Sequence, residues 1–163
     1  MKKRILRIIV IVLCVLLFFA LTRTALVYFG NYVPNKAYFG SDYEQVIYPT
    51  SIPDYLIAKE VLKKADTALS TITDDKNAEG QFGKLGYLCV TDDEAVSEKH
   101  KLDFIAADFS KGKGYLWVKY SSEAYDENGE VTCGSGGSEG ILARWELEKI
   151  NDRWIVISTK ESP

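Results

Sequence analysis

An unbroken apolar run near the N-terminus constrains this chain more than any other feature. Between Ile8 and Leu21 no residue is charged, and 12 of the 14 residues are Leu, Ile, Val or Phe. These residues supply roughly −4 to −7 kcal/mol for insertion into a bilayer, and Arg23 opposes insertion by at most about 3 kcal/mol. A helix from Ile5 to Phe29 would be about 37 Å long, enough to span a bilayer with tilt. We therefore expect residues 1–29 to be a basic cytoplasmic start and a single-pass transmembrane anchor.

The distribution of charge predicts how this anchor is oriented. Lys2, Lys3, Arg4 and Arg7 precede the apolar run, whereas the first acidic residue is Asp42. The positive-inside rule then places the N-terminus in the cytoplasm and the rest of the chain outside the cell membrane. All 23 acidic residues, but only 15 of the 20 basic ones, follow residue 30. Such an acidic exterior part argues against nucleic acid as a partner.

A cleaved signal peptide is the alternative interpretation of the same segment, because a basic start and an apolar core are typical of both. Signal peptides end in small residues, and the possible cleavage sites at residues 20–22 and 23–25 match that pattern poorly. Apolar residues also resume at 25–29. We therefore expect a retained anchor that contacts the membrane through Ile5 to Phe29.

Residues 30–50 are predicted to form an aromatic-rich stalk or arm without a helix. Gly30, Pro34, Gly40 and Pro49 are expected to break any helix or central strand. Five aromatic residues make this stretch unlike a free linker. We expect the rings to pack on the domain or to lie in the lipid interface, and the alternative is a partner-binding arm or an aromatic platform for glycan.

Residues 51–72 give the clearest prediction of a helix. Ser51 is a suitable N-cap, Pro53 suits the first turn, and Asp54 completes a pattern that resembles a capping box. Apolar residues then recur with a 3.6-residue period, at Ala58, Val61, Leu62, Ala65, Ala68, Leu69 and Ile72. A stripe on one side of a helix indicates that the helix packs on another layer, most simply a sheet.

After Phe82 the pattern changes to alternation, which is typical of strands. The predicted strands are 85–91, 101–109, 115–125, 141–150 and 153–159, with a short helix at 92–99 and a glycine-rich loop at 133–140. Turns are expected at 111–114, 126–129 and 151–152. This order predicts an α+β domain over residues 51–163, with one long helix packed on a four- to five-stranded antiparallel sheet.

The alternation also predicts which side chains face the helix. Trp145 shares a strand face with Ile141, Ala143 and Leu147, the most apolar face in the C-terminal half. We expect this face to pack against the apolar stripe of the helix at 51–72.

Two segments carry a resemblance to a known family. They are GYLWVKYSSEAYDENGE at 114–130 and ILARWELEKINDRWIVIS at 141–158, after a long helix that begins at Ser51. This arrangement resembles the NTF2-like/cystatin-like group, and most closely its bacterial extracytoplasmic members with one N-terminal anchor. The resemblance implies a helix cradled by a strongly curved antiparallel sheet. Residues 74–83 leave little room for the extra helices of full NTF2-like domains, so we expect a smaller, cystatin-like version.

Few residues are candidates for chemistry, and we assign no catalytic, cofactor-binding or metal-binding residue. His100 is the only histidine and is expected at the surface or at a strand edge. Steroid-isomerase-like members of the resembled group use an Asp base and Tyr donors inside the cone. Asp103, Asp108, Tyr87 and Tyr120 are of these types, but solvated strand ends explain both acids more simply.

Two further groups of residues leave alternatives open. The run from Gly134 to Ser138 could offer backbone N–H groups to a phosphate, but it lacks the Lys-Ser/Thr ending of a P-loop, so we expect a flexible loop. Cys89 and Cys133 would stabilise the domain by about 3–4 kcal/mol if they formed a disulfide, but their strands need not be neighbours.

These observations favour a membrane-anchored extracytoplasmic binding or interaction domain over an enzyme. The expected partner is an envelope protein or a small ligand. One alternative is a subunit of a conjugation- or secretion-type envelope assembly. Another is a small lyase or isomerase that uses the interior of the cone.

Overall fold

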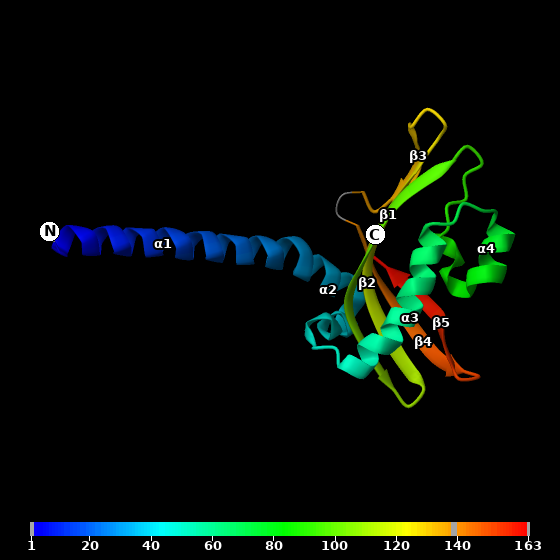
Figure 1. Ribbon diagram of the computed structural model, residues 1–163. Coiled ribbons are helices and arrows are strands. Elements are labelled where there is room, and N and C mark those ends of the chain that lie inside the picture. Colours follow the sequence, from blue (N-terminus) through cyan, green and yellow to red (C-terminus); the bar gives the residue numbers. More distant parts are fainter. Residues whose placement is uncertain (1, 138–139, 163) are drawn as a thin grey trace. The chain divides into compact units, whose positions relative to one another are not determined.

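The computed structural model describes residues 2–137 and 140–162, and the chain divides into two compact units (Figure 1). The first unit extends to Glu44 and the second begins at Gln45.

The first unit is helical. It contains α1 (Lys2–Val27), the π-helical turn η1 (Tyr28–Tyr32), α2 (Val33–Phe39) and the beginning of the 3₁₀ helix η2 (Gly40–Ile47). Among the residues that the structure describes, no helix combines the length and apolar character required to cross a membrane. The side chains of residues 5–10 of the expected anchor lie outside the described part.

The expectation that residues 30–50 contain no helix is wrong. Pro34 lies in the first turn of α2, where its missing N–H is not needed for the helix. Gly40 ends α2 with a φ of 69°, a conformation that glycine adopts without steric cost. Pro34 and Gly40 therefore lie at the two ends of α2, whereas Gly30 lies inside η1. Phe39 and Tyr43 are buried with stacked rings 6.3 Å apart, so part of the aromatic set packs on itself.

In the second unit, helix α3 (Ile52–Leu69) confirms the clearest prediction. The Oγ atom of Ser51 accepts a hydrogen bond from the backbone N–H of Asp54 at 3.2 Å, and Pro53 lies in the first turn. The helix ends before Ile72 because the backbone then becomes extended and pairs with Val90. The Val90 N–H donates to the carbonyl of Thr71 at 2.9 Å.

Two further helices follow: α4 (Asp75–Phe82) and the 3₁₀ helix η3 (Gly83–Leu88). They correct two expectations, the strand at 85–91 and the lack of room for a helix at 74–83. Leu85 and Leu88 are both buried and lie three residues apart, as in a helix with three residues per turn. A short apolar run does not distinguish this arrangement from a buried strand.

The sheet contains β1 (Ser97–Ser110), β2 (Lys113–Tyr125), β3 (Val131–Ser135), β4 (Ile141–Ile150) and β5 (Arg153–Glu161). Its order is β1-β2-β4-β5, with β3 also paired to β2, and every pairing is antiparallel. Register shifts leave one extra residue in each of β1, β3 and β5, and such irregularities bend strands. The domain is therefore α+β with a curved antiparallel sheet, as predicted.

Two elements predicted around this sheet are wrong. The short helix at 92–99 is a turn in which the N–H of Ala95 donates to the carbonyl of Asp92, and β1 begins at Ser97. The glycine-rich loop predicted at 133–140 begins later, because residues 133–135 belong to β3. Ser138 lies outside the described residues.

The two tight hairpins are confirmed. Lys111 and Gly112 join β1 to β2, and Asn151 and Asp152 join β4 to β5. All four residues have positive φ, at 53°, 79°, 49° and 62° respectively. Two consecutive residues with positive φ are typical of the hairpin turns whose twist matches that of the strands.

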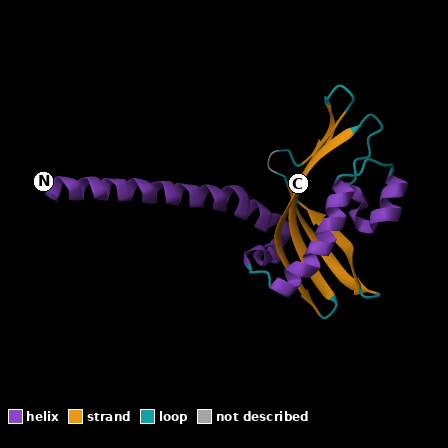
Figure 2. Ribbon diagram, in the orientation of Figure 1, coloured by secondary structure: helices purple, strands orange, loops and turns teal. Residues whose placement is uncertain are grey.

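The core lies between the sheet and the helices α3 and α4, which cover one face of it (Figure 2). Ala58, Ala65 and Ala68 of α3 are fully buried and allow close approach of large side chains on the sheet. Trp145 and Leu147 belong to the same cluster as these alanines, so the prediction that Trp145 lies in the core covered by this helix is confirmed.

Trp117 on the opposite face of the sheet is buried as well. Its Nε1 and the Nε of Arg144 both donate to the Oε1 of Gln45, each at 3.1 Å. These two hydrogen bonds hold the start of the second unit against the outer face of the sheet.

Candidate functional site

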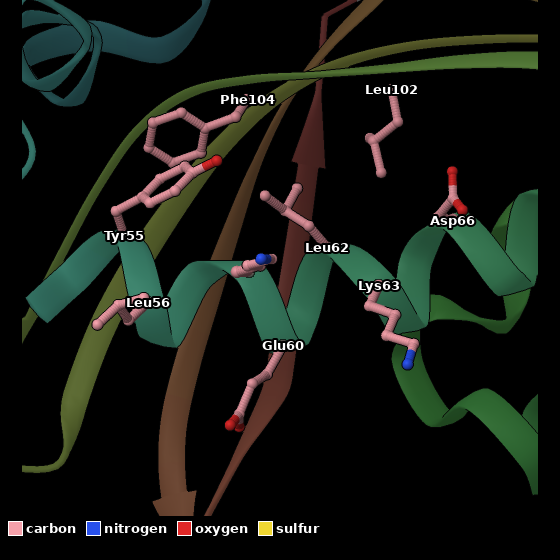
Figure 3. A pocket seen from close by; sticks show the side chains of 9 residues that line it. Tyr55, Leu56, Glu60, Leu62, Lys63, Asp66, Leu102 and Phe104 are labelled. Carbon is pink, nitrogen blue, oxygen red and sulfur yellow. The ribbon is translucent and has the colours of Figure 1, made fainter. Parts of the chain in front are cut away.

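An open groove of about 700 Å³ lies between α3 and β1 in the second unit (Figure 3). Its lining residues come from only these two elements: Tyr55, Leu56, Lys59, Glu60, Leu62, Lys63, Asp66, Leu102 and Phe104.

Helical and strand periodicity together build the floor of the groove. Tyr55 and Leu62 lie seven residues apart on α3 and therefore share one side of the helix. Leu102 and Phe104 are alternate residues of β1 and share one face of the strand. The rings of Tyr55 and Phe104 meet edge to face with centroids 5.2 Å apart. The floor is therefore apolar and is held on rigid elements.

The outer rim of the groove combines exposed apolar and basic side chains. Leu56 is 59% exposed and Tyr55 is 46% exposed, so both side chains present apolar surface to water. Figure 3 shows Glu60 and Lys63 pointing away from the strand side of the groove. Within the described part of the chain, neither Lys59 nor Lys63 has a carboxylate within 4.0 Å. Lys59 and Lys63 therefore outnumber Glu60, the acidic side chain of this rim, and form no salt bridge with it.

His100 lies at the end of the groove marked by Asp66. Its Nε2 is 2.9 Å from the Oδ1 of Asp66 on α3, and its Nδ1 is 2.9 Å from the Oε2 of Glu98 on β1. A neutral imidazole has only one N–H, so both hydrogen bonds to ionised carboxylates require the imidazolium form. Burial lowers the pKa of His100, but the hydrogen bonds and charges of Asp66 and Glu98 outweigh it, so the pKa is raised.

His100 lies on the edge strand β1, as expected, and its side chain is 18% exposed. Sequence reasoning missed its partner Asp66, which is 34 residues away along the chain. The only local signal was Glu98, two residues before His100.

The outer edge of β1 is only partly covered. β1 is an edge strand whose ladder partner in the described sheet is β2. The backbone N–H of Ala107 donates to the Oγ1 of Thr50 at 2.9 Å, and that of Phe109 to the Oδ1 of Asp54 at 3.2 Å. These bonds occupy the edge beyond the register shift between Phe104 and Ala106, whereas residues 97–104 precede it.

Tyr87 and Tyr120, which were considered for isomerase-like chemistry, do come together. Their rings meet with centroids 6.4 Å apart, and the hydroxyl of Tyr120 donates to the Oε1 of Glu161 at 2.7 Å. The Nε1 of Trp145 donates to the hydroxyl of Tyr87 at 3.0 Å. Burial, together with Glu161, raises the pKa of both phenols, which therefore stay protonated at neutral pH. Sequence reasoning missed Glu161, which follows the predicted end of the last strand.

Asp103 and Asp108 do not join this cluster. Their β2 partners are Lys119 and Tyr115, which alternate with the core residues Leu116, Val118 and Tyr120. Both acids therefore lie on the face opposite the core. Residues five apart normally point to opposite faces, but the bulge after Phe104 adds one residue and reverses the alternation. Asp103 also forms an ion pair with Lys101 at 2.7 Å.

Neither the pair Cys89 and Cys133 nor the glycine-rich segment forms the site considered from the sequence. Cys89 is buried, Cys133 is exposed, and both are free thiols. The disulfide considered from the sequence is therefore not formed. Gly134 and Ser135 belong to β3 and pair with Glu123 and Ser122 of β2, so they form part of a strand ladder and not an anion-binding loop.

A smaller hollow of about 460 Å³ lies on the other side of α3, beside the edge strand β5. It is lined by Glu60, Val61 and Lys64 of α3, by Phe82, Gly83 and Leu85, and by residues 152–156. Its apolar residues include Phe82, Leu85 and Val156, which are buried members of the core. The lining also includes Trp154 and the 41% exposed Ile155, so apolar surface is exposed beside β5 as well.

Comparisons with known proteins leave the family open. No protein-family model matches the chain, and no curated protein matches it. Among solved structures, the chain is similar to the association domain of CaMKII from C. elegans, with 8% identity and a TM-score of 0.34. That match covers 67% of this chain and 92% of the other. At this TM-score we infer nothing further from the likeness, and the α+β class rests on the observed elements.

Proposed function

We propose that this protein is a membrane-anchored binding domain whose groove between α3 and β1 receives a segment of a partner protein outside the membrane. The exposed apolar surface of the groove, with Leu56 59% exposed beside a rigid floor, is the observation that carries the proposal. Surfaces of this kind, rimmed by charged residues, are typical of interaction sites.

The openness of the groove favours a protein segment over a small ligand. Small-molecule sites bury most of the surface of their ligand, within walls that enclose it. This groove is lined by only one helix and one strand, and its rim side chains project into solvent. A polypeptide can follow such a groove and bury the rim residues along its length. A subunit of an envelope assembly is one form that this function would take.

The proposed anchor is the segment from Ile5 to Phe29. Its support is the uncharged run from Ile8 to Leu21 and the exposure of large apolar side chains on α1, such as Phe18 at 66% and Phe19 at 65%. Side chains of this size that are exposed together are favourable in lipid and costly in water.

The exposed thiol of Cys133 provides a direct test of the proposed topology. Intact cells with a permeabilised outer layer are treated with a membrane-impermeant maleimide, and Cys133→Ser is the matched control. We expect labelling of the wild type without cell lysis, whereas labelling only after lysis would place the second unit on the cytoplasmic side.

Site-specific photo-crosslinking tests the groove. A photoreactive amino acid replaces Leu56 in the full-length protein, or Ile150 in the control, which is 43% exposed at the end of β4. We expect a discrete protein adduct from position 56 alone, and we expect Tyr55→Arg to abolish it. Equal adducts from both positions, or adducts with lipid only, would contradict a protein-binding groove.

A further inference from the structure

We infer that the partner segment binds as an added β-strand along residues 97–104 of β1 and places alternate side chains in the groove. This inference rests on the proposed function and specifies the conformation and chemistry of the partner. Three features support it. β1 is an edge strand with an accessible stretch, and an apolar groove lies beside that stretch. The stretch is limited by the occupied N–H groups of Ala107 and Phe109, and the groove is limited by His100 and its bound carboxylates.

The accessible stretch has a defined length. Beyond the bulge, the N–H groups of Ala107 and Phe109 are bound to Thr50 and Asp54, so an incoming strand cannot pair with them. Before the bulge, residues 97–104 form eight consecutive ladder positions with β2 on one side. At about 3.3 Å per residue, this edge can pair with a segment of about 26 Å. Backbone hydrogen bonds along such an edge supply affinity without a required sequence.

The groove then determines which residues the added strand carries. Leu102 and Phe104 face the groove, and His100, two residues before Leu102, is closed off by its bonds to Asp66 and Glu98. Side chains of a paired strand alternate between the two faces, so those on the groove face are apolar and those between them polar. Lys59 and Lys63, which have no carboxylate within 4.0 Å among the described residues, favour an acidic residue near the rim.

Charged residues on β1 do not block this mode of binding. Lysines commonly protect edge strands from unwanted pairing. Here the Nζ of Lys101 is 2.7 Å from the Oδ2 of Asp103, and that of Lys99 lies 4.8 Å from the centre of the Tyr125 ring. Both lysines alternate with Leu102 along β1 and therefore lie on the face of the strand opposite the groove.

The test uses the full-length protein in detergent micelles and a random library of ten-residue peptides. We expect the selected peptides to alternate apolar and polar residues and to slow amide hydrogen exchange in residues 97–104, but not along β5. N-methylation of the peptide N–H groups that face β1 should abolish binding, whereas N-methylation of the alternate N–H groups should not.

Matched protein variants distinguish the groove from the rest of the surface. Leu56→Arg is expected to weaken peptide binding at least about tenfold, or about 1.4 kcal/mol. The control Ile155→Arg, at a residue 41% exposed on the opposite edge strand, is expected to change binding less than about twofold. A larger loss with the control would place the peptide on the other side of α3.

Three other outcomes would overturn the inference. They are selection of helical peptides, protection of α3 without β1, and failure to select any peptide. Protection of β1 without peptide, in a species with the mass of a dimer, would assign the edge to a second copy of the chain. In each case the crosslink at position 56 tests the proposed function independently, so the two failures are distinguishable.

Discussion

Replacing Trp145 with Ala is the sharpest test of how the sheet and α3 form one core. The indole is fully buried, belongs to the same cluster as Ala58, Ala65 and Ala68, and donates from Nε1 to the hydroxyl of Tyr87 at 3.0 Å. Truncation removes the ring, leaves a cavity and deprives Tyr87 of its donor. We expect the free energy of unfolding to fall by about 3–5 kcal/mol, a large share of the 5–15 kcal/mol typical of a domain.

Two further variants separate the contributions to this loss. Trp145→Phe keeps much of the apolar ring and removes the N–H donor, so we expect a smaller loss, about 1–3 kcal/mol. Glu146→Ala is the control, because Glu146 has a half-exposed side chain and accepts a hydrogen bond from the Nη1 of Arg144 at 2.7 Å. Ion pairs at the surface contribute little, so this variant should lose less than about 1 kcal/mol.

Urea unfolding followed by far-ultraviolet circular dichroism measures all three variants in the full-length protein in detergent. The comparison uses the transition midpoint at constant slope, since a changed slope indicates a changed unfolded state rather than a lost contact. Equal losses for Trp145→Ala and Glu146→Ala, or a larger loss for the latter, would show that the two faces of the sheet have been assigned in reverse.

Three other predictions follow from single contacts. The pKa of His100 in the folded protein is raised above the unfolded value of about 6.5. The stabilisation that His100 contributes is therefore complete below that pH and is lost as the pH rises through the folded pKa. His100→Gln should abolish this pH dependence in urea melts between about pH 5 and 9. A maleimide should react with Cys133 in the native protein within minutes and with the buried Cys89 only after unfolding, and equal rates would contradict the burial of Cys89. Asp54→Ala should lower the free energy of unfolding by about 1–3 kcal/mol, because the Asp54 carboxylate accepts a hydrogen bond from the backbone N–H of Phe109. The variant should also speed amide exchange at Phe109, and unchanged exchange there would exclude the contact.

Local chemistry made much of the fold predictable. Ser51 and Pro53 mark the start of α3 through interactions within one helical turn, and the apolar stripe that follows identifies the face that packs. The two tight hairpins could be located because their turn residues tolerate positive φ. Alternation over long strands placed Trp145 on the core face, since every second residue of a regular strand faces the same side.

Shorter patterns were misleading where two periods fitted equally well. Leu85 and Leu88 satisfied a buried strand as well as the 3₁₀ helix η3. Pro34 and Gly40 were interpreted as breaking a helix that they instead delimit. In both cases the choice depended on whether neighbouring segments offered a ladder partner or a core surface, which a local sequence window does not contain.

The candidate site depended on contacts between residues remote in sequence. Asp66 meets His100 across 34 residues, and Asp54 meets Phe109 across 55, because α3 lies against β1 in the folded domain. The bulge after Phe104 placed Asp103 and Asp108 outside the core, although neither residue signals it. The sequence alone therefore determined the elements governed by local backbone preferences and by regular periodicity. The tertiary structure decided the groove and the accessible edge of β1, because both arise from the packing of α3 against the strand and from one inserted residue in the ladder.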